Sequence, residues 1–379
     1  QSANMSGDIY ANRLDAEGNL VWTDETVTVT NSGTPKSDMM IGKGPNCLFI
    51  TWSENGSVYA HCLRDDGTLG VPDLSGGPGD VLLVPSEYAT IQDAIDASED
   101  RDTIIVAPGT YVENINFNGK NIVVGSYYMT YGVDYFIAQT VISGDSNGSV
   151  VTFESGEDST TLLKNFTVTN SGGFGENDWG GGIIVSGGAR PILNSLFIDN
   201  NVGGGLYGNG GGGGLCVIEN GSKPHLKNSI ISNTSSESES GALFACTDGE
   251  IKATNCLIAN NNTYGVSSGC ASGWGDNTIE LINCTITDNS DLGIYAFGIV
   301  SVSNSIIYNN LDYWGGNHSY NNDNGTLTIN NTLIQGGYTG TGNIDTDPLF
   351  IDAANGDYRL SGHSPAIGAG TVTEAPTTD

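Results

Sequence analysis

A short phrase that recurs from Asn165 to Gly336 limits what this chain can fold into more than any other feature. It has a leading Asn, a residue that is usually small, two residues of which the second is apolar, and usually a closing Asn, as in Asn228-Ser-Ile-Ile-Ser-Asn233. By subtraction, the leading residues are 29, 34, 27, 28, 21 and 27 positions apart, and they are Asn165, Asn194, Asn228, Asn255, Asn283, Asn304 and Asn331. Spacing of this kind is typical of a solenoid.

The third residue after each leading Asn is always apolar, which predicts that it faces a continuous interior. These residues are Val168, Phe197, Ile231, Ile258, Ile286, Ile307 and Ile334. The first residue after the Asn points to the same side of a strand and is small in six of seven phrases. Because coils stack at strand spacing, we expect the leading Asn side chains to form a structural ladder of amide hydrogen bonds along the axis.

A second pattern places Gly before an apolar run, about half a coil upstream of the next Asn. Examples are Gly182-Ile-Ile-Val185, Gly214-Leu-Cys-Val217 and Gly293-Ile-Tyr-Ala296. Each coil therefore holds several short strands joined by tight turns. The Ala-, Leu-, Glu- and Lys-rich runs of helical repeats are missing, so the sequence predicts a parallel β-solenoid.

Residues 1–72 carry a different pattern. Gly7-Asp-Ile-Tyr-Ala is echoed by Gly56-Ser-Val-Tyr-Ala after 49 residues, and each copy continues through an Asp/Gly turn into a return strand. Cys47–Trp52 is expected as an inner strand. This segment resembles the propeller-type repeats of secreted bacterial proteins, which implies antiparallel, blade-like strands. A linker is expected at 73–84.

The solenoid is expected to begin with one short helix at Tyr88–Ala97, capped by Thr90 and covering the open end of the stack. This helix and the strands up to Val124 resemble the start of the right-handed parallel β-helix, or pectin-lyase-like, superfamily. The later phrases resemble the repeats of polymorphic outer-membrane proteins and related surface β-helices. The resemblance covers residues 85–370, implies a closing coil after Asp345 and leaves 371–379 as a tail. It is specific for fold only, because this architecture hosts enzymes, adhesins and spacers.

The net charge of −31, from 12 Lys and Arg against 43 Asp and Glu, opposes nucleic acid, anionic membranes and polyuronates as partners. Neutral glycans, cations, protein surfaces and other domains of a longer chain remain open as partners.

The sequence contains no run of 18 apolar residues, so no membrane span is predicted. Because the chain starts with Gln1 and shows no signal peptide, we expect a piece of a longer protein. Cys256 and Cys284 are expected as a buried stack, and a pairing of Cys47 with Cys62 stays open.

Segments rich in Gly, Ser or Asn interrupt the coils, and several carry aromatic side chains. If they project from one side, these aromatics could stack on neutral sugar rings, or they could pin the loops to the scaffold. The candidates for glycan contact are Trp179, Tyr207, Trp274, Tyr313 and Trp314.

No catalytic residue is predicted. A lyase of this superfamily needs a basic residue, but Arg190, Lys223 and Lys252 precede their Asn phrases by unequal offsets and are expected on the outer surface. Asp199 and Asp288 do not converge as glycoside hydrolysis requires. Ser143–Glu154 matches the spacing of a calcium loop except at its first position, which leaves calcium open as a cofactor, although a following strand favours a simple turn.

The sequence thus predicts an all-β chain: a right-handed parallel β-helix with a short capping helix, preceded by antiparallel strands. The favoured function is a non-enzymatic extracellular or cell-surface module, structural or adhesive, in a larger protein or assembly that self-associates through its open strand edges. The alternative is a carbohydrate-active enzyme or glycan-binding module that acts on a neutral glycan.

Overall fold

The computed structural model describes residues 5–6, 8–11, 27–30, 34–43, 47–54, 57–64, 69–70, 79–131, 135–172, 180–204, 211–219, 221–236, 240–269, 277–311, 319–322 and 325–372. These residues form two compact units. One contains Gln1–Pro78 and Tyr127–Asp134, and the other contains Gly79–Ser126 and Tyr135–Asp379.

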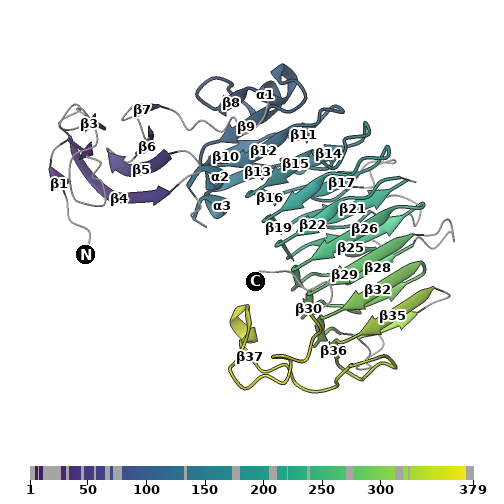
Figure 1. The fold of residues 1–379 in the computed structure, drawn as a ribbon. Coiled ribbons are helices and arrows are strands. Elements are labelled where there is room, and N and C mark those ends of the chain that lie inside the picture. Colours follow the sequence, from purple (N-terminus) through teal and green to yellow (C-terminus); the bar gives the residue numbers. More distant parts are fainter. Residues whose placement is uncertain are drawn as a thin grey trace. The chain divides into compact units, whose positions relative to one another are not determined.

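The larger unit is a parallel β-helix whose coils contribute strands to three long sheets (Figure 1). The ten-stranded sheet contains β8 (Val81–Val84), β9 (Thr103–Val106), β12 (Val123–Ser126), β15 (Leu162–Lys164), β18 (Ile192–Asn194), β22 (His225–Lys227), β26 (Glu250–Thr254), β29 (Thr278–Ile282), β32 (Ile299–Ser303) and β35 (Thr326–Asn330). The nine-stranded sheet contains β10 (Gly109–Val112), β13 (Thr140–Ser143), β16 (Thr167–Thr169), β19 (Phe197–Asp199), β23 (Ile230–Ser232), β27 (Leu257–Ala259), β30 (Thr285–Thr287), β33 (Ile306–Tyr308) and β36 (Leu333–Ile334).

The Gly-led runs form the third sheet. The eight-stranded sheet contains β11 (Ile115–Asn116), β14 (Val151–Phe153), β17 (Ile183–Val185), β21 (Leu215–Ile218), β25 (Gly241–Cys246), β28 (Tyr264–Ser268), β31 (Ile294–Ala296) and β34 (Tyr320–Asn322). Short parallel strands β20 (Val202–Gly203) and β24 (Ser235–Ser236) pair beside it in the coil connections. The expected all-β, right-handed parallel β-helix class is confirmed.

Asn recurs because the residues at both ends of the strands formed by the Asn phrases adopt the left-handed backbone conformation, with positive φ. The leading Asn228 has φ 48° and the closing Asn233 has φ 53°, and the other coils repeat this pair of positive angles. Among residues other than Gly, Asn and Asp tolerate this conformation best. Asn228 and Ser229 separate β22 from β23, and the left-handed Asn228 sets the corner of the coil.

The apolar position of the phrase lies in the core as expected, with one correction. Val168, Ile231 and their equivalents in later coils are fully buried. In the coil that contains an extra residue, however, Ile198 is the buried one and pairs in register with Val168 and Ile231, so Phe197 was wrongly assigned. The reason is that Ser195, not Asn194, takes the left-handed corner there with φ 54°.

The leading Asn side chains are hydrogen-bonded along part of the stack. Asn228 Nδ2 donates to Asn194 Oδ1 at 2.9 Å, Asn255 donates to Asn228 at 2.8 Å, and Asn283 donates to Asn255 at 2.9 Å. Within the described residues the Oδ1 atom of Asn165 is buried without a hydrogen-bond partner. The reason is that the next coil has Ser195, and not an Asn, at the corner position, so the amide ladder does not extend to Asn165.

A second row of Asn runs inside the core, one residue after the closing position of the phrase. Asn261 Nδ2 donates to Asn289 Oδ1 and Asn289 Nδ2 donates to Asn310 Oδ1, both at 2.8 Å. Asn201 occupies the same place in an earlier coil and donates to the carbonyl of Val168 at 2.9 Å. Buried amides of this kind are tolerated because they satisfy one another.

The N-terminal end of the stack is closed by α1 (Ile91–Ala97). Thr90 caps this helix as expected, since its Oγ1 accepts the backbone N–H of Asp93 at 3.0 Å. Ile91 and Ile95 are buried in the main core. The expected linker at 73–84 ends too late, because Val81–Val84 forms strand β8 and pairs in parallel with β9.

The expected closing coil after Asp345 is absent from the described residues. Instead β37 (Phe350–Asp352), the short helix η1 (Ala353–Asn355) and β38 (Asp357–Leu360) form a small antiparallel hairpin. Asn260 Nδ2 donates to Tyr358 Oη at 2.9 Å, and the backbone of Thr371 exchanges two hydrogen bonds with the Asn304 side chain. The chain thus returns along the flank of the stack, because this segment has too few buried apolar side chains to form a coil.

The smaller unit is antiparallel, as expected. Its sheet has the order β1 (Met5–Ser6), β4 (Pro35–Lys43), β5 (Cys47–Glu54), β6 (Ser57–Arg64) and β7 (Leu69–Gly70), and β2 (Tyr10–Ala11) pairs with β3 (Val27–Thr28). Cys47–Trp52 lies in the inner strand β5, and Trp52, Ile50 and Leu63 share a core with Val29. Cys62 pairs in register with Phe49, so it is not directly opposite Cys47.

Two further helices are short: α2 (Tyr128–Tyr131) and α3 (Tyr135–Gln139). None of the helices in the described parts of the chain has the length and apolar character needed to cross a membrane.

Candidate ligand-binding groove

Ionisable side chains are distributed unequally over the three long sheets. Counting only Lys, Arg, His, Asp and Glu within the strands, the ten-stranded sheet carries Lys164, His225, Lys227, Glu250, Lys252 and Glu280, the nine-stranded sheet carries Asp199, and the eight-stranded sheet carries none. Asp199 accepts hydrogen bonds from Ser232 and Asn233. No pair of free carboxylates therefore converges on the described strands.

The outer face of the eight-stranded sheet is apolar from β17 to β25, whereas the same row carries Asn116, Thr152, Ser267 and Asn321 in other coils. Cys216, Phe244 and Cys246 form a second buried cluster there, separate from the main core. Further along, Tyr295 stacks on Tyr264 with ring centroids 4.8 Å apart. This face thus offers packing rather than acid–base chemistry.

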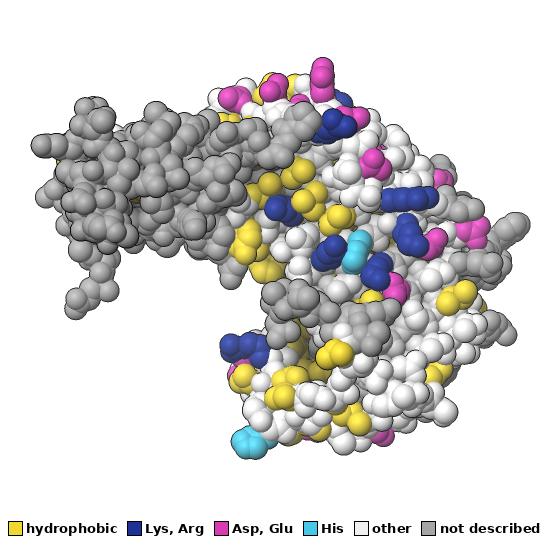
Figure 2. Space-filling model, in the orientation of Figure 1, with side chains coloured by type: hydrophobic (Ala, Val, Ile, Leu, Met, Phe, Trp, Pro, Cys, Tyr) yellow, Lys and Arg dark blue, Asp and Glu magenta, His cyan; other side chains and the backbone are white. Residues whose placement is uncertain are grey.

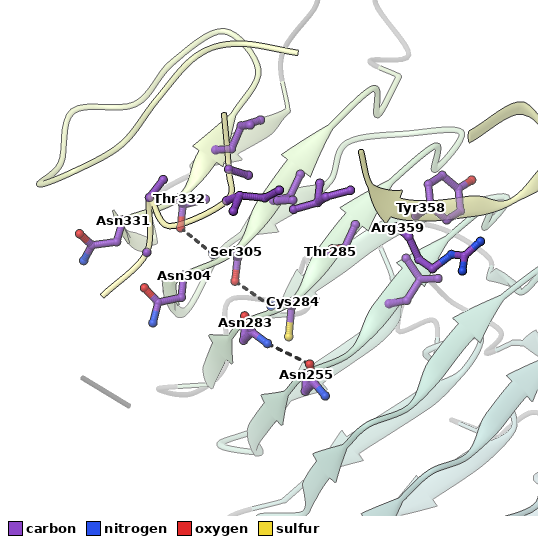
Figure 3. Close-up of a pocket in the computed structure, with 18 of the residues that line it drawn as sticks. Asn255, Asn283, Cys284, Thr285, Asn304, Ser305, Asn331, Thr332, Tyr358 and Arg359 are labelled. Carbon is purple, nitrogen blue, oxygen red and sulfur yellow. Dashed lines mark hydrogen bonds between the residues drawn. The ribbon is translucent and has the colours of Figure 1, made fainter. Parts of the chain in front are cut away.

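A groove of about 680 Å³ lies between the Asn corner of the nine-stranded sheet and the returning C-terminal segment. Its volume falls in the range of small-molecule sites. Figure 3 shows Asn255, Asn283, Asn304 and Asn331 on successive coils along one side, and Tyr358 and Arg359 on the other.

The first wall combines amides with apolar side chains. The four Asn side chains line it beside Leu257, Thr285, Ile306 and Leu333, the first residues of β27, β30, β33 and β36. The corner places these groups together because each Asn is followed, two residues later, by an outward strand position. Corresponding groups of adjacent coils are about 4.8 Å apart, which is the spacing of neighbouring strands.

The second wall is the segment from Gly356 to Gly370. Arg359 Nε and Nη2 donate to the two oxygens of Asp357 at 2.8 and 2.6 Å, and this bidentate contact lowers the pKa of Asp357. Burial and the nearby Asp288 carboxylate raise the pKa of Tyr358 to about 12. The Tyr358 hydroxyl is therefore protonated over the whole physiological range.

The groove has almost no net electrostatic character. Among the described residues that line it, Asp357 and Arg359 carry the only charges, and they neutralise each other. The remaining groups are amides, hydroxyls, backbone and apolar side chains. A neutral ligand with hydroxyl groups and an apolar face matches this lining.

Several predicted site residues lie outside the described residues: Trp179, Tyr207, Trp274, Tyr313 and Trp314. The loops that contain Trp179, Tyr207, Tyr313 and Trp314 all connect the nine-stranded to the eight-stranded sheet, whereas Trp274 follows β28 and precedes a strand of the ten-stranded sheet. Their contact with glycan stays a prediction.

The loop with calcium-like spacing does not fit a calcium site. Val151–Phe153 is strand β14, as expected, and the Glu154 carboxylate accepts a hydrogen bond from Asn116 Nδ2 at 2.7 Å. Over the described ranges no three His, Cys, Asp or Glu side chains gather as metal ligands would.

Sequence reasoning missed the groove itself. Half of its lining comes from the Asn phrases, but the other half comes from residues between Gly342 and Gly370, as the contact between Asn260 and Tyr358 illustrates. The inner Asn row had a readable signal in the doublets Asn200-Asn201, Asn260-Asn261 and Asn309-Asn310.

Solved structures with a similar fold include pectin-active enzymes. Pectate lyase Pel9A is 14% identical with a TM-score of 0.47, covering 78% of this chain and 93% of that chain. Pectin methylesterase from carrot is 16% identical with a TM-score of 0.46, covering 73% and 86%. The enzyme from Aspergillus niger is 16% identical with a TM-score of 0.45, covering 72% and 87%.

No family model and no curated protein matches the sequence. At these identities, no residue role is carried over from the solved structures.

Proposed function

We propose that this protein is a non-enzymatic, extracellular β-helix module that binds a neutral glycan in the groove between the Asn corner and the C-terminal segment. The observation that carries the proposal is the lining of that groove: a row of amides faces apolar side chains, and the single ion pair is internally neutralised.

The amide row supplies the polar half of glycan recognition. Asn carboxamides both donate and accept hydrogen bonds, as sugar hydroxyls do. Asn283 and Asn255 keep their ladder contact while their remaining donor and acceptor capacity faces the groove edge. Repetition at strand spacing suits a ligand that itself repeats along a chain.

The apolar half comes from Leu257, Ile306 and Ile367, which line the same groove. Sugar rings present C–H faces that gain from burial against such side chains. A strongly charged ligand would find no complementary free charge among the described lining residues. These points favour a neutral glycan over an acidic one at this site.

The same lining argues against hydrolysis. Glycosidases need two carboxyl groups on either side of the bond that breaks. Asp357 is the one carboxylate among the described lining residues, and both its oxygens are held by Arg359. The groove is therefore proposed to bind without turnover, in keeping with an adhesive role.

An extracellular location is supported by cysteine chemistry. Cys246 is disulfide-bonded, and disulfides persist in oxidising compartments. Cys256 and Cys284 are free but buried, so they are protected from oxidation in such an environment.

The test is a glycan array followed by calorimetry on the full chain, with a reducing-end assay on the same samples. The variant Thr285→Trp fills the groove, and Thr326→Trp makes the same change at an exposed position of β35. We expect wild type and Thr326→Trp to bind neutral oligosaccharides equally, and Thr285→Trp to lose at least about tenfold in affinity, which corresponds to about 1.4 kcal/mol.

New reducing ends would overturn the non-enzymatic part of the proposal. Binding of wild type to no neutral glycan, or binding that Thr285→Trp leaves unchanged, would overturn the site.

A further inference from the structure

Two free cysteines occupy the same position in adjacent coils, directly after the leading Asn of their phrases. They are Cys256 and Cys284, and the residues that follow them, Leu257 and Thr285, pair in register. Cys256 is 3% exposed and Cys284 is 1% exposed, and both contribute to the lining of the groove. The two thiols therefore lie next to each other at the inner edge of the groove.

The two thiols point in the same direction. Each Sγ atom donates to the carbonyl two residues earlier in the chain, at 3.3 Å for Cys256 and 3.4 Å for Cys284. Each also reaches one carbonyl of the preceding coil, that of Leu226 or that of Ala253, and these two residues pair in register. Because the contacts repeat from coil to coil, the two sulfur atoms are separated by about the spacing of strands, about 4.8 Å.

The corner of the coil does not need sulfur at this position. Ser229, Ser305 and Thr332 occupy it in three other coils, and each hydroxyl donates to the carbonyl two residues earlier at 2.6 to 2.9 Å. A thiol is a weaker donor than a hydroxyl. Hydrogen bonding thus does not account for cysteine in two consecutive coils, whereas a ligand that prefers sulfur does.

We propose that Cys256 and Cys284 bind one copper(I) ion between their sulfur atoms, in a linear site with two ligands. A metal midway between the sulfurs would lie about 2.4 Å from each, close to a metal–thiolate bond, which is about 2.3 Å for zinc. Thiolates are soft ligands and select Cu(I). On binding, both thiols release their protons to solvent and form two Cu–S bonds, and the oxidation state of copper does not change.

The backbone at the corner suits the negative charge of this complex. Ser229 Oγ accepts the N–H of Leu196 at 3.1 Å, and Ser305 Oγ accepts the N–H of Cys284 at 3.0 Å (Figure 3). The sulfur atoms of Cys256 and Cys284 contact the backbone of Ser229 and Cys256 in the equivalent way. Backbone donors of this kind stabilise metal-bound thiolates.

Other metals fit less well. Structural zinc and iron–sulfur centres take four protein ligands, and groups of three or more such side chains are absent from the described ranges. Calcium and magnesium take oxygen ligands. The one carboxylate among the described groove-lining residues, Asp357, is held by Arg359, and Figure 2 shows mainly uncharged surface around β35 and β36.

A disulfide is the competing use of this pair. Its Cβ atoms are about 3.8 Å apart, whereas equivalent atoms of adjacent strands are about 4.8 Å apart. The backbone is held at the strand spacing, since the N–H of Thr285 donates to the carbonyl of Cys256 at 2.9 Å. A disulfide would draw these bonded strands together by about 1 Å. A bridging metal ion leaves them where they are.

The experiment is an anaerobic titration of the full chain with Cu(I), in competition with bicinchoninate, and a parallel titration with Zn(II). The test variants are Cys256→Ser and Cys284→Ser, which copy the serine of other coils. The matched control is Cys216→Ser, which removes a free, buried thiol from the separate cluster on the eight-stranded sheet. Circular dichroism confirms that each variant is folded, and thermal unfolding is measured with and without Cu(I).

We expect wild type and Cys216→Ser to bind one Cu(I) more per chain than either test variant. The test variants should lose at least about hundredfold in affinity for this ion, because a lost ligand matters more than a lost partner of a ligand. Cu(I) should raise the unfolding midpoint of wild type and of Cys216→Ser, since it binds only the folded pair, and should leave the test variants unchanged.

Equal Cu(I) binding by wild type and Cys256→Ser would overturn the inference. So would tighter binding of Zn(II) than of Cu(I) at this pair, or a Cys256–Cys284 disulfide found by mass spectrometry in the purified chain. An unfolding midpoint of wild type that Cu(I) does not raise would overturn it without any variant. The titration contains no glycan, so its failure and failure of the groove proposal give different results.

Discussion

Asn289 donates a side-chain hydrogen bond to Oδ1 of Asn310 at 2.8 Å in the interior of the solenoid, where neither residue exceeds 4% exposure. The position of the Asn310 amide also explains why residue 293 is a glycine. A Cβ placed on Gly293 would lie 2.8 Å from Asn310 Nδ2. Gly182 and Gly265 face the amides of Asn201 and Asn289 in the same way, so these three glycines and the inner Asn row belong to one packing arrangement.

Removing the central amide of this row should be costly. In Asn289→Ala, the backbone N–H of Asn261 loses its acceptor and Asn261 Nδ2 loses one of its two acceptors. Asn310 Oδ1 keeps the backbone N–H of residue 289 but loses the Nδ2 donor, and the Ile258 carbonyl loses the same donor. Burying these groups unpaired should lower the free energy of unfolding by about 2 to 4 kcal/mol. Denaturant titration followed by circular dichroism measures the change.

The matched control is Asn262→Ala, because Asn262 is an exposed neighbour whose side chain accepts from Ser290 at 3.2 Å. We expect it to change stability by no more than about 0.5 kcal/mol. Equal effects of the two variants would show that the inner row does not stabilise the core.

The leading Asn should depend more on backbone conformation than on its ladder bonds. Asn255 has φ 58° and takes part in two ladder contacts. Asn255→Gly loses the contacts but keeps the conformation, whereas Asn255→Ala loses both, and a left-handed Ala costs about 1 to 2 kcal/mol. We expect Ala to be less stable than Gly by about 1 kcal/mol at this site.

Thermal unfolding of both variants tests this order, with Thr254→Gly and Thr254→Ala as the control pair in strand β26. There Gly should be the less stable residue. An Asn255→Ala variant as stable as Asn255→Gly would contradict the conformational explanation.

Local patterns made most of the β-helix predictable. The apolar third position, the Gly-led runs and the Thr90 cap depend on neighbours within one coil, so sequence spacing identifies them. The same reasoning failed at Phe197, because one extra residue moves every following side chain to the other face of the strand.

Contacts between distant coils could not be predicted in the same way. Arg190 and Lys223 have unequal offsets from the next Asn, yet each lies two residues before paired positions, Ile192 and His225. Offset from the Asn was the wrong reference, because Ser195, and not Asn194, takes the left-handed corner in the coil that follows Arg190. The groove could not be predicted from the sequence, because its two walls are distant in the chain: Tyr358 contacts Asn260, which lies 98 positions earlier.

The stability of the solenoid should decline on mild acidification through His225. Burial, and then Lys227 and Lys252, lower the pKa of His225 to about 4, while Glu280 acts in the opposite direction. Between about pH 6.5 and pH 4 the unfolded state therefore binds more protons at this residue, so its contribution to stability falls as pH falls.

The measurement is the unfolding midpoint at pH 7 and pH 5 for wild type and His225→Gln. The variant should lose less stability than wild type between the two values. An NMR titration that places the His225 pKa near 6.5 would remove the basis of this prediction.

The returning C-terminal segment should be the least stable part of the groove. Tyr358 Oη accepts from Asn260 at 2.9 Å and also interacts with Asp288, whereas Leu349, Ile351 and Ile367 are at least 40% exposed. With so few buried contacts, this segment should open locally without unfolding the coils. Tyr358→Phe removes the hydroxyl contacts and should ease opening by about 1 kcal/mol, which corresponds to roughly fivefold.

Trypsin reports this opening, because Arg359 lies inside the segment and is 78% exposed at its side chain. Cleavage after Arg359 should be several-fold faster in Tyr358→Phe, while the global unfolding midpoint stays unchanged. Tyr111→Phe deletes a hydroxyl bonded to the Ala107 carbonyl near the other end of the stack and should leave this cleavage rate unaltered. Equal rates in wild type and Tyr358→Phe would mean that other contacts hold the segment in place, with the backbone bonds between Thr371 and Asn304 the next to be tested.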